Sequence, residues 1–418
     1  MKEYKLSQLL EIKNGKDHKE LPNGDYPVFG SGGVMRYVNE YLYDKPSILL
    51  LRKGSLNNIQ YCDVPFWTVD TLYYTEVNEK IACPYYLYNY LCLLDLSGLD
   101  TGTGVPSMTF DSYYNIKVLL PEIEEQKRVA SVLQNLDHKI ALNRQINDNL
   151  EEMSKQLYDY WFVQFDFPNE EGKPYKSSGG AMVWNEKLKR EIPQGWYADN
   201  ICKIANILSG GTPSKAVDDY WNNGTIPFFG PTDYNGNVFQ IKTADHITQK
   251  GLEHCASFLF EEGIVIITAR GSIGKLVIVG TPMAMNQSCY ALQSKEGKFE
   301  YLYFLTIQLI DCLKAKGSGS VFKSIIASDI EHSILCVATE NIVSDFCKKV
   351  KPLFEKLKTN TIEIAELTKQ RDELLPLLMN GQATINYHLS LHLSNIVLYT
   401  LHYLGTVQNH VVRVLKII

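Results

Sequence analysis

The amino-acid sequence contains the same ordered set of motifs twice. The segment GDYPVFG, which begins at Gly24, recurs as GTIPFFG from Gly224, 200 positions later. Three further matches follow 215 to 217 positions apart, in the same order: Arg52-Lys53-Gly54-Ser55 with Ala269-Arg270-Gly271-Ser272, Pro65 with Pro282, and Tyr86-Leu87-Tyr88 with Tyr301-Leu302-Tyr303. Stacked-repeat proteins have periods of about 20 to 50 residues. The much longer spacing predicts that a whole domain is duplicated, with small loop insertions.

Each copy ends in a segment with the heptad pattern of a coiled coil. From Val129 to Trp161, and again from Phe346 to Leu378, apolar and small polar residues recur in steps of three and four. This spacing predicts two long helices, each with a partner helix, and about 40 helical residues span about 60 Å. Asn143 and Asn360 hold the same heptad position. A buried asparagine fixes register at some cost in stability, so we expect this pair to set the helix alignment, the alternative being solvated side chains.

Before each helix lies a segment rich in aromatic and β-branched residues. Runs such as 48–51 and 264–268 predict buried strands that end in glycine turns, with short helices near 83–96 and 299–315. The fold class is therefore α+β. The predicted organisation is a mixed domain (1–120), a helix (121–165), a polar, glycine-rich linker (166–196), a second mixed domain (197–338), a second helix (339–381) and an atypical, apolar tail (382–418).

Composition and motifs argue against an enzyme. The formal net charge of −6 excludes a uniformly basic nucleic-acid coat, although cations can gather on one face. Gly271 to Lys275 is not a phosphate-binding loop, because Ala269 and Leu276 break the required pattern. Nine cysteines contain no CxxC pair, and no metal-binding cluster is evident. With no signal peptide and no apolar run of spanning length, the sequence predicts a cytoplasmic protein.

Several motifs carry a family resemblance. They are Leu208-Ser-Gly-Gly-Thr-Pro-Ser-Lys215, a weaker counterpart from Ile12 to Lys16, the segment Ala269–Gly274, and two helical segments, Glu125–Asp137 and Arg371–Gly381. Together with the two domain–helix units, they resemble the specificity subunits of type I restriction-modification systems over residues 1–381. The resemblance implies two target-recognition domains, each reading one half of a bipartite double-stranded DNA site, and two antiparallel spacer helices.

The resemblance also implies partners and cofactors. The spacer helices would dock two methyltransferase (M) subunits, and restriction/translocase (R) subunits would join for cleavage. This chain would be non-catalytic and would bind no cofactor or metal itself, while the partners would bind S-adenosylmethionine, ATP and Mg²⁺. Two alternatives remain: a duplicated coiled-coil scaffold that binds only protein, and an inactive specificity subunit altered by its tail.

Residues that contact DNA are expected among loop cations, amides and small polar groups, because base edges and phosphates are recognised by such side chains. In the first copy the candidates are Lys16, Arg36, Arg52, Lys53, Asn57 and Asn58. In the second copy they are Lys215, Arg270, Ser272, Lys275, Asn286 and Gln287.

Overall fold

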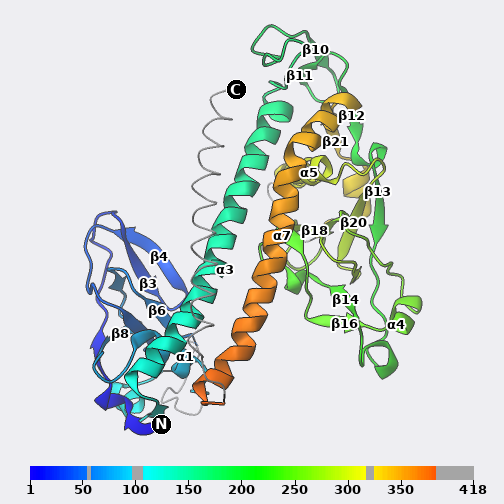
Figure 1. The fold of residues 1–418 in the computed structure, drawn as a ribbon. Coiled ribbons are helices and arrows are strands. Elements are labelled where there is room, and N and C mark those ends of the chain that lie inside the picture. The colour runs from blue at the N-terminus through cyan, green and yellow to red at the C-terminus, as the bar shows by residue number, and fades with distance from the viewer. Residues whose placement is uncertain (54–57, 97–106, 317–323, 383–418) are drawn as a thin grey trace. The chain divides into compact units, whose positions relative to one another are not determined.

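The computed structural model describes residues 1–53, 58–96, 107–316 and 324–382 (Figure 1). It divides into two compact units. The first comprises Met1–Lys139 and the chain from Leu367 onward, and the second comprises Ile140–Glu366. Asn57 and most of the predicted tail lie outside the described residues.

The first unit is built on a four-stranded antiparallel sheet in the order β2-β8-β5-β6. Its central strand β5 is completely buried, as its apolar run predicts. The strands of this sheet are β2 (Leu10–Asn14), β5 (Ser47–Leu51), β6 (Gln60–Cys62) and β8 (Leu72–Val77). The other elements of the unit are β1 (Lys2–Lys5), η1 (Leu6–Gln8), β3 (Tyr26–Gly30), β4 (Gly33–Val38), β7 (Trp67–Thr68), α1 (Pro84–Cys92), α2 (Phe110–Tyr114) and β9 (Lys117–Leu120). They form a three-stranded sheet, β4-β3-β7, and a β1-β9 pair.

The second unit has a five-stranded sheet in the order β13-β20-β17-β18-β15, a three-stranded sheet β16-β14-β19, and two strand pairs, β12-β21 and β10-β11. The strands are β10 (Met182–Asn185), β11 (Arg190–Pro193), β12 (Tyr197–Asn200), β13 (Ala205–Ser209), β14 (Ile226–Phe229), β15 (Phe239–Gln240), β16 (Asp245–Ile247), β17 (Val265–Thr268), β18 (Leu276–Val279), β19 (Ala284–Met285), β20 (Cys289–Ser294) and β21 (Ile334–Val337). The short helices are η4 (Ile201–Lys203), η5 (Asp218–Tyr220), η6 (Pro231–Asp233), α4 (Gln249–Glu253), α5 (Phe299–Lys316) and α6 (Ala327–Glu331).

Strand register confirms the predicted duplication. In β3 and β7 the pair is Val28 with Trp67, and in β14 and β19 it is Phe228 with Ala284. The same relation joins β5–β6 to β17–β18, where Leu49 faces Gln60 and Ile266 faces Val277. The residues of the second copy stand 200 or 217 positions after those of the first. Equivalent residues are therefore hydrogen-bonded to equivalent partners.

Within the second mixed domain, strand β15 has no counterpart among the described residues of the first domain. β3 and β4 are joined by a tight turn at residues 30–33, whereas the chain between β14 and β16 is longer and contributes β15. β15 runs parallel to β18 and becomes the edge of the five-stranded sheet. The insertion therefore extends the sheet rather than forming only a loop.

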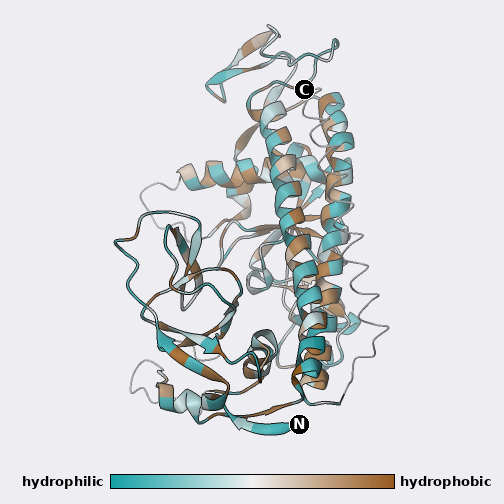
Figure 2. Ribbon diagram, turned by 60° about the vertical axis from the view of Figure 1, so that its left-hand side comes forward, coloured by the Kyte–Doolittle hydropathy of each residue, from teal (hydrophilic) through white to brown (hydrophobic). Residues whose placement is uncertain are grey.

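The two predicted long helices are α3 (Ile123–Tyr158), which continues into the π-helical turn η3 (Asp159–Val163), and α7 (Glu340–Met379). Apolar and polar residues alternate along both helices (Figure 2). Within the second unit, Asn143 bonds to Glu363 and Asn147 bonds to Thr361. The partner number falls as α3 advances, which is the pairing order of antiparallel helices. No helix in the described part of the chain is long and apolar enough to cross a membrane.

The segment between the copies is more structured than its polar composition suggests. It contains the β10–β11 hairpin, and Phe167 stacks on both Tyr175 and Trp196, with ring centroids 4.6 and 5.2 Å apart. Phe167 and Trp196 belong to the main hydrophobic core of the second unit. Residues 166–196 therefore contribute to a core rather than acting only as a connector.

Candidate nucleic-acid interface

Four segments of the second unit converge at the ends of its strands. Backbone hydrogen bonds join them: Gly211 N to Met285 O (3.1 Å), Asn286 N to Phe229 O (3.0 Å) and Arg270 N to Ser288 O (3.2 Å). We call residues 210–215, 230–234, 269–275 and 286–288 the second-unit loop cluster. The strand register brings these segments together although they are up to 78 positions apart in sequence, from 210 to 288.

A glycine makes the closest approach in this cluster possible. A Cβ atom at Gly210 would lie 2.2 Å from the main-chain oxygen of Asn286, far closer than any van der Waals contact. In the first unit, a Cβ at Gly15 would lie 2.1 Å from the oxygen of Val69. Gly15 and Gly210 are equivalent positions. The two motifs around these glycines, which the sequence analysis identified, therefore share one requirement: a residue without a Cβ atom where two backbone segments meet.

The turn between β17 and β18 presents most of the predicted polar residues. Gly271 and Gly274 have positive φ angles of 75° and 74°, which glycine adopts without strain. The Thr268 hydroxyl accepts a hydrogen bond from the Lys275 amide at 2.9 Å, which braces the turn. Arg270, Ser272 and Lys275 are exposed on it. The turn joins two strands, whereas a phosphate-binding loop leads from a strand into a helix.

The other predicted residues of the second copy lie in the same cluster. The Lys275 ammonium stands over the Tyr234 ring, 5.4 Å from its centroid, and Lys215 stands at the same distance over Trp221. Gln287 accepts a hydrogen bond from the Thr212 hydroxyl. The Asn286 side chain accepts one from the Ser288 amide at 2.9 Å. Of the described residues, none is a hydrogen-bond or ion-pair partner of the Arg270 side chain.

An equivalent first-unit loop cluster is formed by residues 15–16, 30–33, 52–53, 58–60 and 69–71. Lys16 N donates to Thr68 O (2.8 Å), and Lys53 N donates to Thr71 O (3.4 Å). The second bond repeats, 217 positions earlier, the bond from Arg270 to Ser288. Lys53 therefore holds the position of Arg270. Lys16, Lys53 and Asn58 are exposed.

Three first-copy candidates have internal roles. The half-buried Arg36 donates from Nη2 to the Leu21 carbonyl (2.8 Å) and to Asn23 Oδ1 (2.9 Å), which ties the β4 strand to the preceding loop. Arg52 donates to the Asp70 carbonyl at 3.3 Å, and Asn58 donates to the Ser31 carbonyl at 2.5 Å. These side chains therefore have fewer N–H donors left for contacts with DNA than the sequence suggests.

Sequence reasoning missed residues that shape the second-unit cluster. Asp233 accepts hydrogen bonds from the amides of Gly230 and Ala244, both at 2.8 Å, and so holds the loop after β14. Its place three residues after a glycine and two after a proline is a helix-capping signal that could have identified it. Thr212 orients Gln287, and no sequence signal predicts that contact.

The seam between α3 and α7 in the second unit contains a buried chain of polar groups. The Asn360 amide donates to Asn147 Oδ1 (2.9 Å), and the Asn147 amide donates to the Thr361 hydroxyl (3.2 Å). Asn143 instead donates to Glu363 at 2.9 Å. The two asparagines that share a heptad position therefore have different partners. Asn360 is 0% exposed, and its own Oδ1 has no hydrogen-bond partner in the described ranges.

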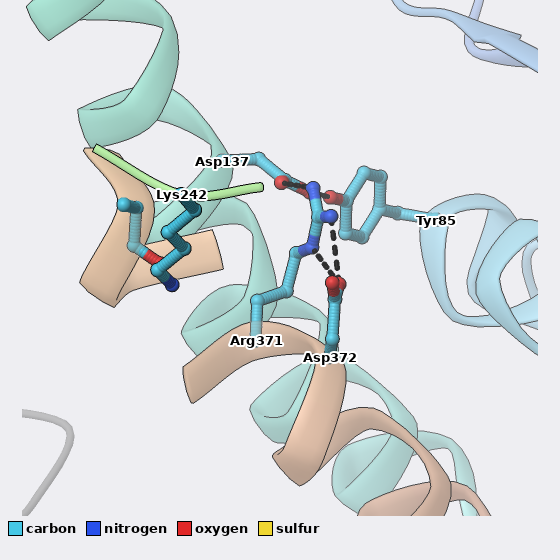
Figure 3. A network of polar contacts seen from close by, with 6 residues as sticks. Tyr85, Asp137, Lys242, Arg371 and Asp372 are labelled. Carbon is cyan, nitrogen blue, oxygen red and sulfur yellow. Dashed lines mark hydrogen bonds and ion pairs between the residues drawn. The ribbon is translucent and has the colours of Figure 1, made fainter. Parts of the chain in front are cut away.

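A second polar network ties α1 to both long helices within the first unit (Figure 3). The Tyr85 hydroxyl donates to Asp137 of α3, which also pairs with Arg371 of α7 at 2.8 Å. Arg371 donates to Asp372 at 2.7 Å as well. Burial, and then the bond to Asp137, raise the pKa of Tyr85, so its hydroxyl stays protonated well above neutral pH. The network fixes the position of α1 on the helix pair.

Comparisons with known proteins agree with this architecture. Residues 1–152 and 193–337 match the model of a family described as the type I restriction modification DNA specificity domain. The MjaIX specificity subunit of Methanocaldococcus jannaschii is 25% identical over 88% of this chain and 86% of that protein. The HindI specificity subunit of Haemophilus influenzae is 25% identical over 73% of this chain and 79% of that protein.

A solved structure, the type I restriction-modification S subunit from M. genitalium, is similar in fold. Its TM-score is 0.61 at 17% identity, over 90% of this chain and 95% of that one. The family match occurs twice along the chain, once in each copy, and covers more than half of the 418 residues. This chain therefore belongs to the family of type I restriction modification DNA specificity domains.

Proposed function

We propose that this chain is the DNA sequence-specificity subunit of a type I restriction-modification complex and reads a bipartite target with its two loop clusters. The observation that carries the proposal is the equivalence of Lys53 and Arg270. Each is an exposed cation, held by the same backbone hydrogen bond at the same place in its own copy. Two equivalent sites in one chain suit a target with two halves.

The side chains of the clusters have the chemistry that DNA recognition requires. Cations bind the phosphates, which position a protein on the duplex without reading its sequence. Arginine donates in a bidentate manner to O6 and N7 of guanine, and amides pair with adenine. Arg270 and Gln287 suit base contacts in the second half-site, whereas Lys16, Lys215 and Lys275 suit phosphates. These assignments, and those of the other loop candidates, are proposals.

The long helices suit the role of a spacer. α7 has 40 residues, which correspond to about 60 Å of helix. That length is comparable to roughly 18 base pairs of DNA, which rises about 3.4 Å per pair. We propose that the register set by Asn143, Asn147 and Asn360 determines the unread gap between the half-sites.

The chemistry would belong to partner subunits. We propose that two methyltransferase subunits dock on the helices and bind S-adenosylmethionine, and that restriction/translocase subunits supply ATP- and Mg²⁺-dependent cleavage. In this assignment the chain is non-catalytic, binds no cofactor and acts in the cytoplasm. The domain boundaries at residues 120, 165, 196, 338 and 381 remain proposals for exchange experiments.

The test is genome-wide mapping of N6-methyladenine in a host without its own systems, expressing this chain with its methyltransferase subunit. We expect a new bipartite motif with a constant gap that disappears when the chain is omitted. Exchange of residues 1–120 for the equivalent domain of a relative should change one half only. The double variant Lys53→Ala/Arg270→Ala should weaken both halves. A soluble complex without methylation would contradict the proposal, and an unchanged motif after exchange would contradict the assignment of two recognition domains.

A further inference from the structure

Asp70 is an exposed acidic residue inside the first-unit loop cluster. It lies between Val69, whose amide donates to the Phe29 carbonyl at 3.1 Å, and Thr71, whose carbonyl accepts from Arg52 and Lys53. The Asp70 main-chain carbonyl itself accepts from the Arg52 guanidinium at 3.3 Å. Hydrogen bonds to Val69, to Thr71 and to the Asp70 carbonyl therefore fix the backbone at this position. Its carboxylate makes no hydrogen bond or ion pair with any described residue.

A free carboxylate at this place needs an explanation. The neighbouring cations Lys16, Arg52 and Lys53 favour the approach of the phosphate backbone, which a carboxylate repels. A negative charge among them weakens binding to DNA in general. It becomes favourable only where it accepts a hydrogen bond that an incorrect base cannot offer. Repulsion of incorrect partners combined with one specific attraction is a common source of specificity.

We propose that Asp70 reads a base of the first half-site by accepting a hydrogen bond from an exocyclic amino group. In the major groove this group is N4 of cytosine or N6 of adenine, whereas guanine and thymine present acceptors at the corresponding edge. The inference rests on the proposed function, because it assumes that the first-unit loop cluster faces DNA.

At the equivalent position, the second copy offers a hydrogen-bond donor in place of a charged acceptor. Gln287 stands 217 positions after Asp70 and carries no charge. Its side-chain oxygen already accepts from the Thr212 hydroxyl, whereas its amide nitrogen bonds to no described residue and remains a donor on this exposed side chain. The nearby Arg270 is also a donor. The first half-site is therefore read with an acceptor and the second with donors, so the two halves are expected to differ in sequence.

The test compares Asp70→Ala and Asp70→Leu, neither of which keeps an acceptor, with a matched variant, Gln287→Ala, in full-length complexes with the methyltransferase subunit. N6-methyladenine mapping gives the motif of each complex. We expect both Asp70 variants to lose roughly tenfold or more of their preference at one position of one half. The base that becomes degenerate identifies cytosine or adenine. Gln287→Ala should change the other half and leave this position intact.

A second measurement separates base reading from simple charge removal. Binding of each complex to a duplex without the motif is measured between low and physiological salt. The Asp70 variants should bind this duplex more tightly, because one repulsive charge is gone. Tighter binding with an unchanged motif would overturn the proposal. A wild-type complex that yields no motif at all would overturn the proposed function, and this inference with it.

Discussion

Replacement of the buried asparagines in the helix seam gives a measurable coupling energy. Asn360 is 0% and Asn147 is 9% exposed, and one bond of 2.9 Å joins their side chains. A net hydrogen bond contributes about 1 kcal/mol, and an orphaned buried polar partner costs about 1–3 kcal/mol. Removal of the unpartnered Asn360 Oδ1 offsets part of this cost, so Asn360→Ala should destabilise the fold by about 1–3 kcal/mol. The double variant Asn147→Ala/Asn360→Ala should lose less than the sum of the single losses, by about 1–2 kcal/mol, because it leaves no orphaned partner.

The assay is thermal unfolding of the full chain, followed by helical circular dichroism in a double-mutant cycle. For a unit the size of Ile140–Glu366, each kcal/mol shifts the midpoint by roughly 2–4 °C. Asn360→Ala should thus lower the midpoint by about 2–12 °C. The control is Thr359→Ala, because Thr359 is exposed on the same turn of α7 and bonds only within its own helix. Thr359→Ala should be additive with Asn147→Ala. Additivity of the two asparagine variants, within about 0.5 kcal/mol, would refute the reasoning.

Three further predictions concern packing and ionisation. Gly210→Ala places a methyl group 2.2 Å from a main-chain oxygen and should destabilise the second unit by about 1–3 kcal/mol in denaturant unfolding, whereas Gly32→Ala, with open space around it, should not. Burial raises the pKa of the Glu300 carboxyl above its ordinary 4.5, so the folded state holds this proton more tightly than the unfolded state does. The contribution of Glu300 to stability is therefore lost as pH rises from 4.5 through the raised pKa. Glu300→Gln should flatten the resulting decline in melting temperature between acidic and neutral pH. Burial raises the pKa of Cys347 to about 12, so mass spectrometry after thiol labelling at pH 8 should find the exposed Cys312 modified well before Cys347.

The regular elements were predictable because their signals are local or repeated. The run from Ile264 to Thr268 contains β17, and the heptads from Val129 and Phe346 lie in α3 and α7. The duplication was visible because equivalent residues keep equivalent strand partners. The strand sequences before Gly30 and Gly230 therefore hold equivalent places in the two copies, where β3 pairs with β7 and β14 pairs with β19.

The remaining features depend on contacts between distant residues. Nothing in the sequence indicates that Asn360 bonds to Asn147 rather than to its heptad equivalent Asn143, because helix direction and stagger decide the partner. Arg36 has the composition of a DNA contact, yet its guanidinium holds the 21–23 loop. Asp70 was overlooked because an acidic residue is not expected in a DNA interface. Its relevance emerges only when strand pairing places it among cations.

The added strand β15 changes how each copy protects its sheet. In the first unit the last strand of the four-stranded sheet is β6, which is only three residues long, and no further described strand pairs with its outer edge. Such short edges are one way in which proteins avoid unwanted strand addition by other chains. In the second unit the equivalent strand β18 is covered by β15. Both sheets therefore end on a short strand, β6 in the first unit and the two-residue β15 in the second, and substitutions that lengthen or flatten β6 should make the first unit more prone to aggregate.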